Sequence, residues 1–264
     1  MRLTLLGTQG WIPTERRETT ALAVSDGSLL LLFDAGTGLS RLLHGPGKAL
    51  VAAAGDVHLF LTHYHLDHVC GLAYVPGIFA GRTLHLHVPE AALNGVDPER
   101  GVAELMRKPF NPRPWADLLV TTDALGEENE IAGHAVRLRA QCHPDTTVAY
   151  RLDDALVLAT DTVADPATSA FARGAQVLLH EAWIDGWEEA DPGQQELVRS
   201  AFQAHSSARQ AAALAADADV DELVLLHLNP LFDEAYYEQM RRSAAAIFPR
   251  SSVYPDLQLI ELRD

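Results

Sequence analysis

The sequence predicts an α/β fold in which two mixed β-sheets are flanked by helices. Short β-type segments dominate the first two thirds of the chain, whereas the last third alternates between strand and helix patterns. Strands that alternate with helices are typical of buried, mostly parallel sheets. With 264 residues and 48% apolar composition, the chain can form a sizeable core without disulfides.

The first part of the chain is expected to supply five strands and two helices. Asp26 and Gly27 form a hairpin signal between two of the strands, and Gly36 and Gly38 interrupt the chain before a short helix. Pro98 opens the second helix, where a missing amide hydrogen is tolerated. The expected strands are Leu3–Leu6, Thr20–Val24, Leu29–Phe33, Val57–Leu61 and Leu84–Val88, and the helices are Leu39–Leu43 and Pro98–Lys108.

The rest of the chain continues as β-structure and then alternates. The expected strands are Leu118–Thr121, Ala135–Ala140, Thr147–Leu152, Leu156–Ala159, Val177–Leu179, Leu223–Leu226 and Leu257–Leu262. The expected helices are Ser169–Ala172, Gln194–Gln203, Ser207–Ala216 and Glu234–Ile247. We interpret the alanine-rich segments 211–218 and 244–246 as helix surface.

Net charge disfavours several classes of function. Twenty Lys and Arg against 36 Asp and Glu give a net charge of −16, which repels nucleic-acid phosphates. The longest basic runs are two pairs of arginines, at 16–17 and 241–242. No apolar run approaches the ~20 residues that span a bilayer, and the first residues lack a signal-peptide pattern. We therefore expect a cytoplasmic protein without membrane contact.

Histidines carry the strongest chemical signal. The chain has twelve, and four candidate ligands fall within segment 63–68, directly after the strand Val57–Leu61. His63 and His65 face the same way in an extended segment, and Asp67 and His68 follow as the chain turns into a helix. Neutral imidazole and carboxylate groups bind zinc, iron or manganese. The segment therefore predicts a metal site that can serve two adjacent ions.

Other candidate ligands are interpreted as structural. His85 and His87 alternate on one strand face and could bind a metal together, but we prefer a polar outer face of an edge strand. We expect Cys70 and Cys142 to be reduced, small, buried side chains. His180 is interpreted as a buried histidine that has its hydrogen bonds satisfied.

Segment 63–68 resembles the His-x-His-x-Asp-His signature of the metallo-β-lactamase superfamily. Later motifs follow in the same order, each after a predicted strand. The resemblance implies an αββα four-layer sandwich, formed as a single domain over residues 1–264. It implies two divalent ions, Zn²⁺ first, with Mn²⁺ or Fe as alternatives. The implied ligands are His63, His65 and His143 for one ion, Asp67, His68 and His227 for the other, and Asp161 as the bridge.

Further segments resemble the ribonuclease Z branch of this superfamily, which includes small-substrate phosphodiesterases. They are 7–13, 33–36, 179–182 and 205–207, with Trp183 where the branch usually has Thr. Ribonuclease Z itself has a long insertion that grips transfer RNA between the strands near His143 and Asp161. Here seventeen residues separate the two. The missing arm and the net charge disfavour RNA as a partner.

The resemblance implies a binuclear metal-dependent hydrolase, and we favour a phosphodiesterase in which activated hydroxide attacks a small phosphodiester. Asp67 would orient or deprotonate the nucleophile, His205 would protonate the leaving oxygen, and Glu181 would hold the tautomer of His205. The alternative for Glu181 and His205 is a structural hydrogen bond, with Ser206 as a plain helix cap.

Three other functions stay open. A tRNA 3′-processing endoribonuclease would need a basic groove. A lactone or carboxyl-ester hydrolase would use the same metals with less need of Glu181 and His205, and a metal-binding module would have no turnover. We expect a homodimer, because such proteins commonly dimerise. Segment 106–115, with three prolines, is expected to form a loop beside the site, and Thr146 and Thr147 to be strand formers rather than phosphate donors.

Overall fold

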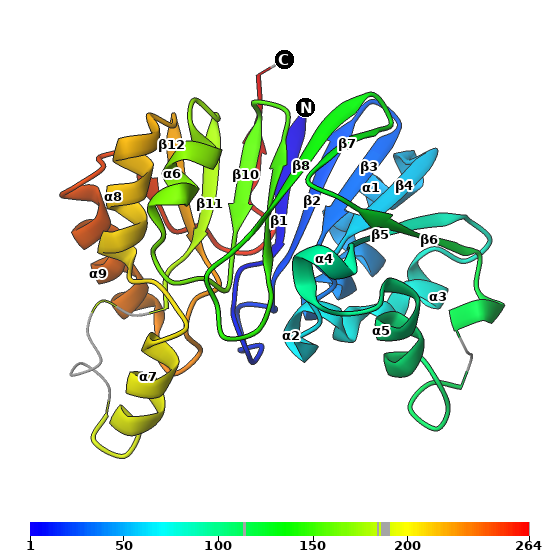
Figure 1. Cartoon of the computed structure of the whole chain (residues 1–264), viewed down its shortest axis with the longest axis horizontal. Coiled ribbons are helices and arrows are strands. Elements are labelled where there is room, and N and C mark those ends of the chain that lie inside the picture. The colour runs from blue at the N-terminus through cyan, green and yellow to red at the C-terminus, as the bar shows by residue number, and fades with distance from the viewer. Residues whose placement is uncertain (113–114, 184, 186–190, 264) are drawn as a thin grey trace. The chain divides into compact units, whose positions relative to one another are not determined.

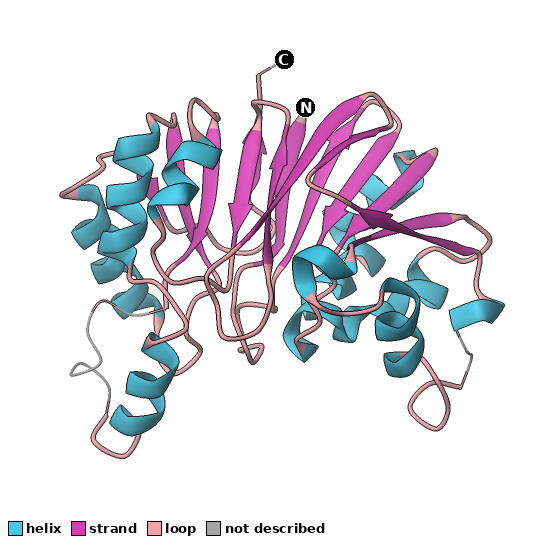
Figure 2. Cartoon of the chain, viewed as in Figure 1, coloured by secondary structure: helices cyan, strands magenta, loops and turns pink. Residues whose placement is uncertain are grey.

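The computed structural model describes residues 1–112, 115–183, 185 and 191–263. These residues form two compact units. The first unit comprises Met1–Thr8, Ile12–Gly126 and Pro255–Asp264, and the second comprises Gln9–Trp11 and Glu127–Tyr254. Among the residues described, each unit contains one mixed sheet of seven strands, with helices beside it (Figures 1 and 2). The predicted α/β class with two mixed sheets flanked by helices is therefore confirmed.

The sheet of the first unit has the strand order β14-β1-β2-β3-β4-β5-β6. Antiparallel pairs join β14 through β3, and parallel pairs join β3 through β6. The strands are β1 (Arg2–Gly7), β2 (Ala21–Asp26), β3 (Leu29–Phe33), β4 (Asp56–Phe60), β5 (Leu84–Pro89), β6 (Val120–Leu125) and β14 (Leu259–Glu261). The helices between the parallel strands are η1 (Thr37–Leu43), α1 (Gly45–Ala53), α2 (Leu66–Val69), η2 (Cys70–Tyr74), α3 (Val75–Ile78), α4 (Ala91–Asn94), α5 (Pro98–Leu105) and η3 (Trp115–Asp117).

One face of this sheet packs on the helices of the same unit. Leu32 of β3 and Leu59 of β4 belong to one buried cluster with Leu39 of η1 and Leu72 of η2. Because alternate residues of a strand point to the same face, this cluster takes every second side chain of β3, β4 and β5. The packing fixes the carboxyl ends of β3 and β4, where the candidate ligands begin.

The sheet of the second unit has the order β13-β12-β11-β10-β9-β8-β7. Strands β10 to β13 pair in parallel, and β7 to β10 pair antiparallel. The strands are β7 (Glu128–Ile131), β8 (His134–Ala140), β9 (Val148–Leu152), β10 (Leu156–Ala159), β11 (Val177–Glu181), β12 (Glu222–Leu226) and β13 (Ser251–Ser252). The helices are α6 (Pro166–Ala172), α7 (Gln195–Phe202), α8 (Ala208–Ala218) and α9 (Glu234–Ala245).

The alanine-rich stretch of α8 is a helix, but the expectation that it forms a surface was wrong. Ala211, Ala212 and Ala215 are fully buried in a cluster with Leu178 of β11 and Met240 of α9. Methyl side chains occupy little room, so α8 can pack closely on its neighbours. Alanine composition alone does not say which side of a helix faces a sheet.

Most predicted elements lie within a few residues of the observed ones, and several short elements were missed. The missed elements are α1, η2, α3, α4, η3, β7 and β13. Strand β7 has the polar sequence ENEI, and its side chains are only partly buried or exposed, so it lacks the apolar alternation that marks a strand. Helix α1 begins with Gly45, Pro46 and Gly47, which resemble a turn, although Pro46 stands where a helix accepts proline.

The histidines of β5 do not form the polar face of an edge strand, because β5 lies between β4 and β6. His87 is 3% exposed, its Nε2 lies 2.8 Å from Nδ1 of His58, and its ring stacks on Phe60. His85 is half-buried, with Nδ1 2.9 Å from the hydroxyl of Thr121. The interpretation as an outer polar face was therefore wrong, and the cluster belongs to the interior of the sheet.

The two cysteines are free thiols that differ in exposure. Cys142 is exposed, so the expectation of a buried side chain was wrong there, and Cys70 is half-buried. Burial raises the pKa of the Cys70 thiol.

No helix among the described residues is long and apolar enough to cross a membrane.

Candidate metal centre

The candidate ligands lie at the carboxyl ends of strands in both units. In the first unit, segment 63–68 follows β4. In the second unit, Asp161 and His227 follow β10 and β12, and Glu181 ends β11 between them. Because parallel strands end at one edge of a sheet, side chains that follow them gather there. His143 follows the antiparallel strand β8.

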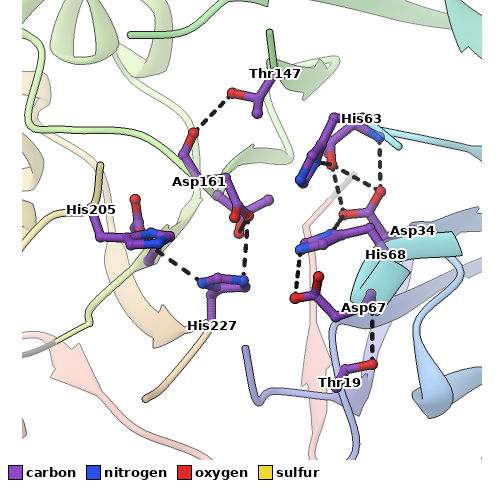
Figure 3. A network of polar contacts seen from close by, with 12 residues as sticks. Thr19, Asp34, His63, Asp67, His68, Thr147, Asp161, His205 and His227 are labelled. Carbon is purple, nitrogen blue, oxygen red and sulfur yellow. Dashed lines mark hydrogen bonds and ion pairs between the residues drawn. The ribbon is translucent and has the colours of Figure 1, made fainter. Parts of the chain in front are cut away.

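The imidazoles of segment 63–68 converge. The ring centroid of His63 lies 4.5 Å from that of His65 and 4.3 Å from that of His68. Oδ2 of Asp67 lies 3.3 Å from Nε2 of His68 (Figure 3). His63 and His68 are buried, at 2% and 0% exposed. The first unit therefore clusters all four of its predicted ligands.

Asp34 is a buried carboxylate that we did not identify from the sequence as a site residue. Its Oδ2 accepts a hydrogen bond from Nδ1 of His68 at 2.7 Å (Figure 3), and its Oδ1 accepts one from the backbone N–H of Thr62 at 2.8 Å. A carboxylate on one nitrogen of a histidine fixes the ring and directs the other nitrogen toward a metal. Asp34 therefore positions His68. The available signal was an Asp placed directly after a buried strand.

Five predicted site residues come together in the second unit. His227 lies between two carboxylates. Its Nε2 is 3.4 Å from Oδ2 of Asp161 (Figure 3), and its Nδ1 is 3.7 Å from Oε2 of Glu181. His143, Asp161 and His205 offer ligand atoms within 4.8 Å of one another, and Glu181, His205 and His227 do the same. Burial lowers the pKa of His143, which favours the neutral ring that binds metals.

Glu181 and His205 form the closest ion pair of this group. Oε2 of Glu181 lies 2.7 Å from Nδ1 of His205, and the carboxylate is fully buried. Burial opposes ionisation of Glu181, but the charge and hydrogen bond of His205, together with a hydrogen bond from His227, hold the pKa of the carboxyl below its usual value. Trp183 stacks on the ring of His205, with 4.5 Å between the ring centroids.

Three site residues have left-handed backbone conformations, which cost roughly 1–3 kcal/mol for residues other than glycine. Asp34, Asp161 and His227 have φ angles of 60°, 54° and 52°. The hydroxyl of Thr147 donates to the backbone carbonyl of Asp161 at 2.8 Å, so Thr147 supports this turn. A Cβ on Gly10 would lie 2.7 Å from ring atoms of His227, so any larger residue at this position would clash with that ring.

Two neighbouring residues have structural roles. Ser207, not Ser206, caps α8 in a capping box, and the hydroxyl of Ser206 donates to the carbonyl of Thr162 at 2.7 Å. His180 is fully buried, as expected, with Nδ1 2.9 Å from the carbonyl of Glu181, but its buried Nε2 has no hydrogen-bond partner among the described residues, so the expectation of satisfied hydrogen bonds was wrong. Of the loop 106–115, Pro114 lies outside the described residues.

The donor set of each unit fits divalent transition metals. Imidazole nitrogens and carboxylate oxygens are the ligands that zinc, manganese and iron accept. The imidazoles of His63, His68 and His227 are at most 2% exposed, and Asp161 is 3% exposed. Buried imidazole and carboxylate groups that lie close together within one unit are stabilised by a cation among them.

Comparison with known proteins identifies the family. Residues 30–228 match the model of a family described as a beta-lactamase superfamily domain. The chain belongs to the metallo-β-lactamase superfamily. Ribonuclease Z of Mycobacterium sp. (strain KMS) is 29% identical over 281 aligned positions, covering 99% of this chain and 96% of the relative. Ribonuclease BN of Enterobacter sp. (strain 638) is 26% identical over 324 positions, covering 98% and 99%.

A solved structure of the superfamily agrees with this assignment. The metallo-beta-lactamase fold protein YhfI from Bacillus subtilis superimposes with a TM-score of 0.74 at 20% identity, covering 98% of this chain and 99% of that protein. The two ribonuclease relatives are similar to this chain along nearly its whole length, and the solved structure shares its fold. The chain is thus a metallo-β-lactamase-fold hydrolase, whose fold implies divalent metal ions.

Proposed function

We propose that this chain is a binuclear metal-dependent phosphodiesterase with a small substrate. The ligand assignment follows the superfamily signature and combines donors of both units, which we expect to work as a single domain over residues 1–264. We propose Zn²⁺ as the ion, with Mn²⁺ or Fe as alternatives. The proposed ligands are His63, His65 and His143 for one ion, Asp67, His68 and His227 for the other, and Asp161 for both.

The ions and the side chains would divide the chemistry. Two bound divalent ions supply a hydroxide nucleophile near neutral pH and offset the charge of the phosphoryl oxygens. The carboxylate of Asp67 would orient the nucleophile or take its proton. Asp34 holds His68 from behind by its 2.7 Å hydrogen bond, which keeps the ligand geometry fixed through the reaction.

The Glu181–His205 pair is the observation on which we base the choice of a phosphodiester substrate. The oxygen that leaves a phosphodiester needs a proton, and a positioned histidine is the usual donor. Glu181 holds Nδ1 of His205 at 2.7 Å, so a protonated His205 can offer its Nε2 proton to the leaving oxygen. The buried carboxylate also offsets the positive charge of the protonated ring. Glu181 is thus a positioning residue, and His205 the proposed proton donor.

Ribonuclease activity is the second candidate, because the curated relatives are named ribonuclease Z and ribonuclease BN. Two observations weigh against it. Strands β9 and β10 are joined by a tight turn at 153–155, so the segment between His143 and Asp161 holds no long arm. The enterobacterial alignment spans 324 positions against 264 residues here, so that relative carries segments without a counterpart in this chain. The net charge of −16 adds to both.

Hydrolysis of bis(p-nitrophenyl) phosphate by metal-loaded protein tests the proposal. We expect turnover of this diester, with His65→Ala and His205→Ala both strongly impaired. Parallel assays on p-nitrophenyl acetate, a lactone and a tRNA precursor separate the alternatives. Turnover of esters or lactones that survives His205→Ala, without diester turnover, would establish a carbonyl hydrolase instead. Inertness of fully metal-loaded protein on every substrate would leave a metal-binding module.

A further inference from the structure

An apolar cavity of about 430 Å³ lies in the first unit beside the candidate ligands. One wall comes from Leu66, Cys70 and Ala73, which follow one another at helical spacing along α2 and η2. The facing wall comes from the end of α5 and the turn after it, including Met106 and Phe110. The volume is within the range of small-molecule pockets.

The cavity is attached to the ligand segment at two points. Leu66 stands between His65 and Asp67, so their Cα atoms are ~3.8 Å from its own. Helix α5 lies against the same segment, because a Cβ on Gly101 would come within 2.7 Å of Cε1 of Tyr64. The cavity therefore adjoins the backbone of the segment that carries four of the candidate ligands.

The side chains of the cavity favour a flat, uncharged ligand. Phe110 is 76% exposed and Leu66 is 66% exposed, although exposure of such large apolar side chains is unfavourable. No described lysine or arginine lines the cavity, and its one carboxylate, Glu104, is paired with Arg100 at 2.6 Å. A further phosphate group would find no cation on this wall. An aromatic ring could stack on Phe110 and contact the sulfur of Met106.

The turn that carries Phe110 is held in place. The side-chain amide of Asn111 donates to the backbone carbonyl of Leu105 at 3.3 Å, and the backbone N–H of Phe110 donates to the carbonyl of Arg107 at 3.0 Å. These bonds order the backbone of the turn that carries Phe110, which lines the cavity together with Leu66. A fixed wall loses little conformational entropy when a ligand binds.

We propose that this cavity binds the aromatic ester group of the substrate, a planar ring attached to the phosphate. The inference rests on the proposed function, since it assigns the cavity to the substrate of the same site. The substrate class is then an aryl or nucleoside phosphodiester with one phosphate, rather than a polynucleotide. Phe110 and Leu66 are its specificity-determining residues.

Calorimetric binding of phenylphosphonate and methylphosphonate to zinc-loaded protein tests the proposal, because the two ligands share the phosphonate group and differ in the ring. We expect phenylphosphonate to bind at least about 10-fold more tightly, and Phe110→Ala to remove about 10-fold of its affinity while methylphosphonate is unaffected. Phe110→Trp, which keeps an aromatic face, should retain the preference. Leu259→Ala, which truncates an exposed leucine of the same unit outside the cavity, should change nothing.

Several results would overturn the proposal. They are equal affinity for the two phosphonates, no binding of either one, and equal losses for both in Phe110→Ala. If Phe110→Ala changes the protein from dimer to monomer but still binds phenylphosphonate more tightly than methylphosphonate, the apolar surface around Phe110 is instead an interface between two copies of the chain. Failure of the proposed function is a separate result: protein that prefers phenylphosphonate but hydrolyses no phosphodiester would keep the cavity assignment and reject the reaction.

Discussion

The buried imidazole of His87 should make the stability of the protein depend on pH below neutrality. Its ring is 3% exposed and stacks on Phe60, with 4.7 Å between centroids, and Nε2 lies 2.8 Å from Nδ1 of His58. Burial, with a smaller contribution from the charge of His58, lowers the pKa of His87 to about 4. Asp123, His85 and Asp56 modify this value by smaller amounts.

The sign and the size of the effect follow from this pKa. Histidine in an unfolded chain titrates near 6.5, so between that pH and about 4 the unfolded state binds a proton that the folded state does not. The contribution of His87 is thus fully present above pH 6.5 and is lost as the pH falls toward 4. The difference between a pKa of 6.5 and one of about 4 corresponds to about 3 kcal/mol in total, of which about 2 kcal/mol disappears between pH 7 and pH 5.

Urea unfolding at pH 7 and pH 5 measures this loss. His87→Gln removes the titrating ring but keeps an amide that can hydrogen-bond to His58. It should lose about 2 kcal/mol less between the two pH values than the unmodified protein, even if it is less stable at both. His44→Gln removes an exposed histidine and should follow the unmodified protein. The reasoning is refuted if His87→Gln loses as much stability on acidification as the unmodified protein.

Three further substitutions test the candidate metal centre. Glu181→Gln should lower kcat for bis(p-nitrophenyl) phosphate by about 100-fold or more at unchanged metal content, because the ring it orients loses its charged partner; unchanged kcat would make the pair purely structural. Asp34→Asn should weaken zinc affinity by about 10- to 100-fold in competition with a chelator, and undiminished affinity would exclude a positioning role. Gly10→Ala should displace His227 and reduce zinc per chain, whereas Gly77→Ala, which points into open space, should not.

The candidate ligands could be predicted because their signal is local. His63 and His65 directly follow an apolar strand, and Asp161 and His227 end strands that sequence patterns also mark. Asp34 could not be assigned in this way. Its role depends on the parallel pairing of β3 with β4, with Phe33 opposite Phe60, which brings it to a histidine 34 residues further along the chain. The spacing of residues along the sequence does not reveal that β3 pairs with β4.

The errors elsewhere have the same origin. The alanines of α8 indicate a helix, but alanine is nearly neutral in hydropathy, so which side is buried depends on the sheet that the helix packs against. The position of β5 inside its sheet depends on β6, a partly exposed strand whose predicted start was misplaced. His87 was therefore assigned to a surface. Short-range patterns predict elements, whereas the burial of a given side chain depends on elements distant in the sequence.

Several residues at the strand ends of the site have features that reduce the stability of the folded protein. Asp34, Asp161 and Glu181 are carboxylates at most 3% exposed, and two of them also have left-handed backbone conformations. Buried carboxylates cost several kcal/mol unless hydrogen bonds or cations compensate them. Within each unit, histidines of the site supply part of this compensation: His68 for Asp34, His205 for Glu181 and His227 for Asp161. Because the same contacts orient those imidazoles, the arrangement that limits the cost of the carboxylates is also the one that a divalent cation requires. An otherwise unfavourable cluster of this kind is retained where it serves binding or catalysis.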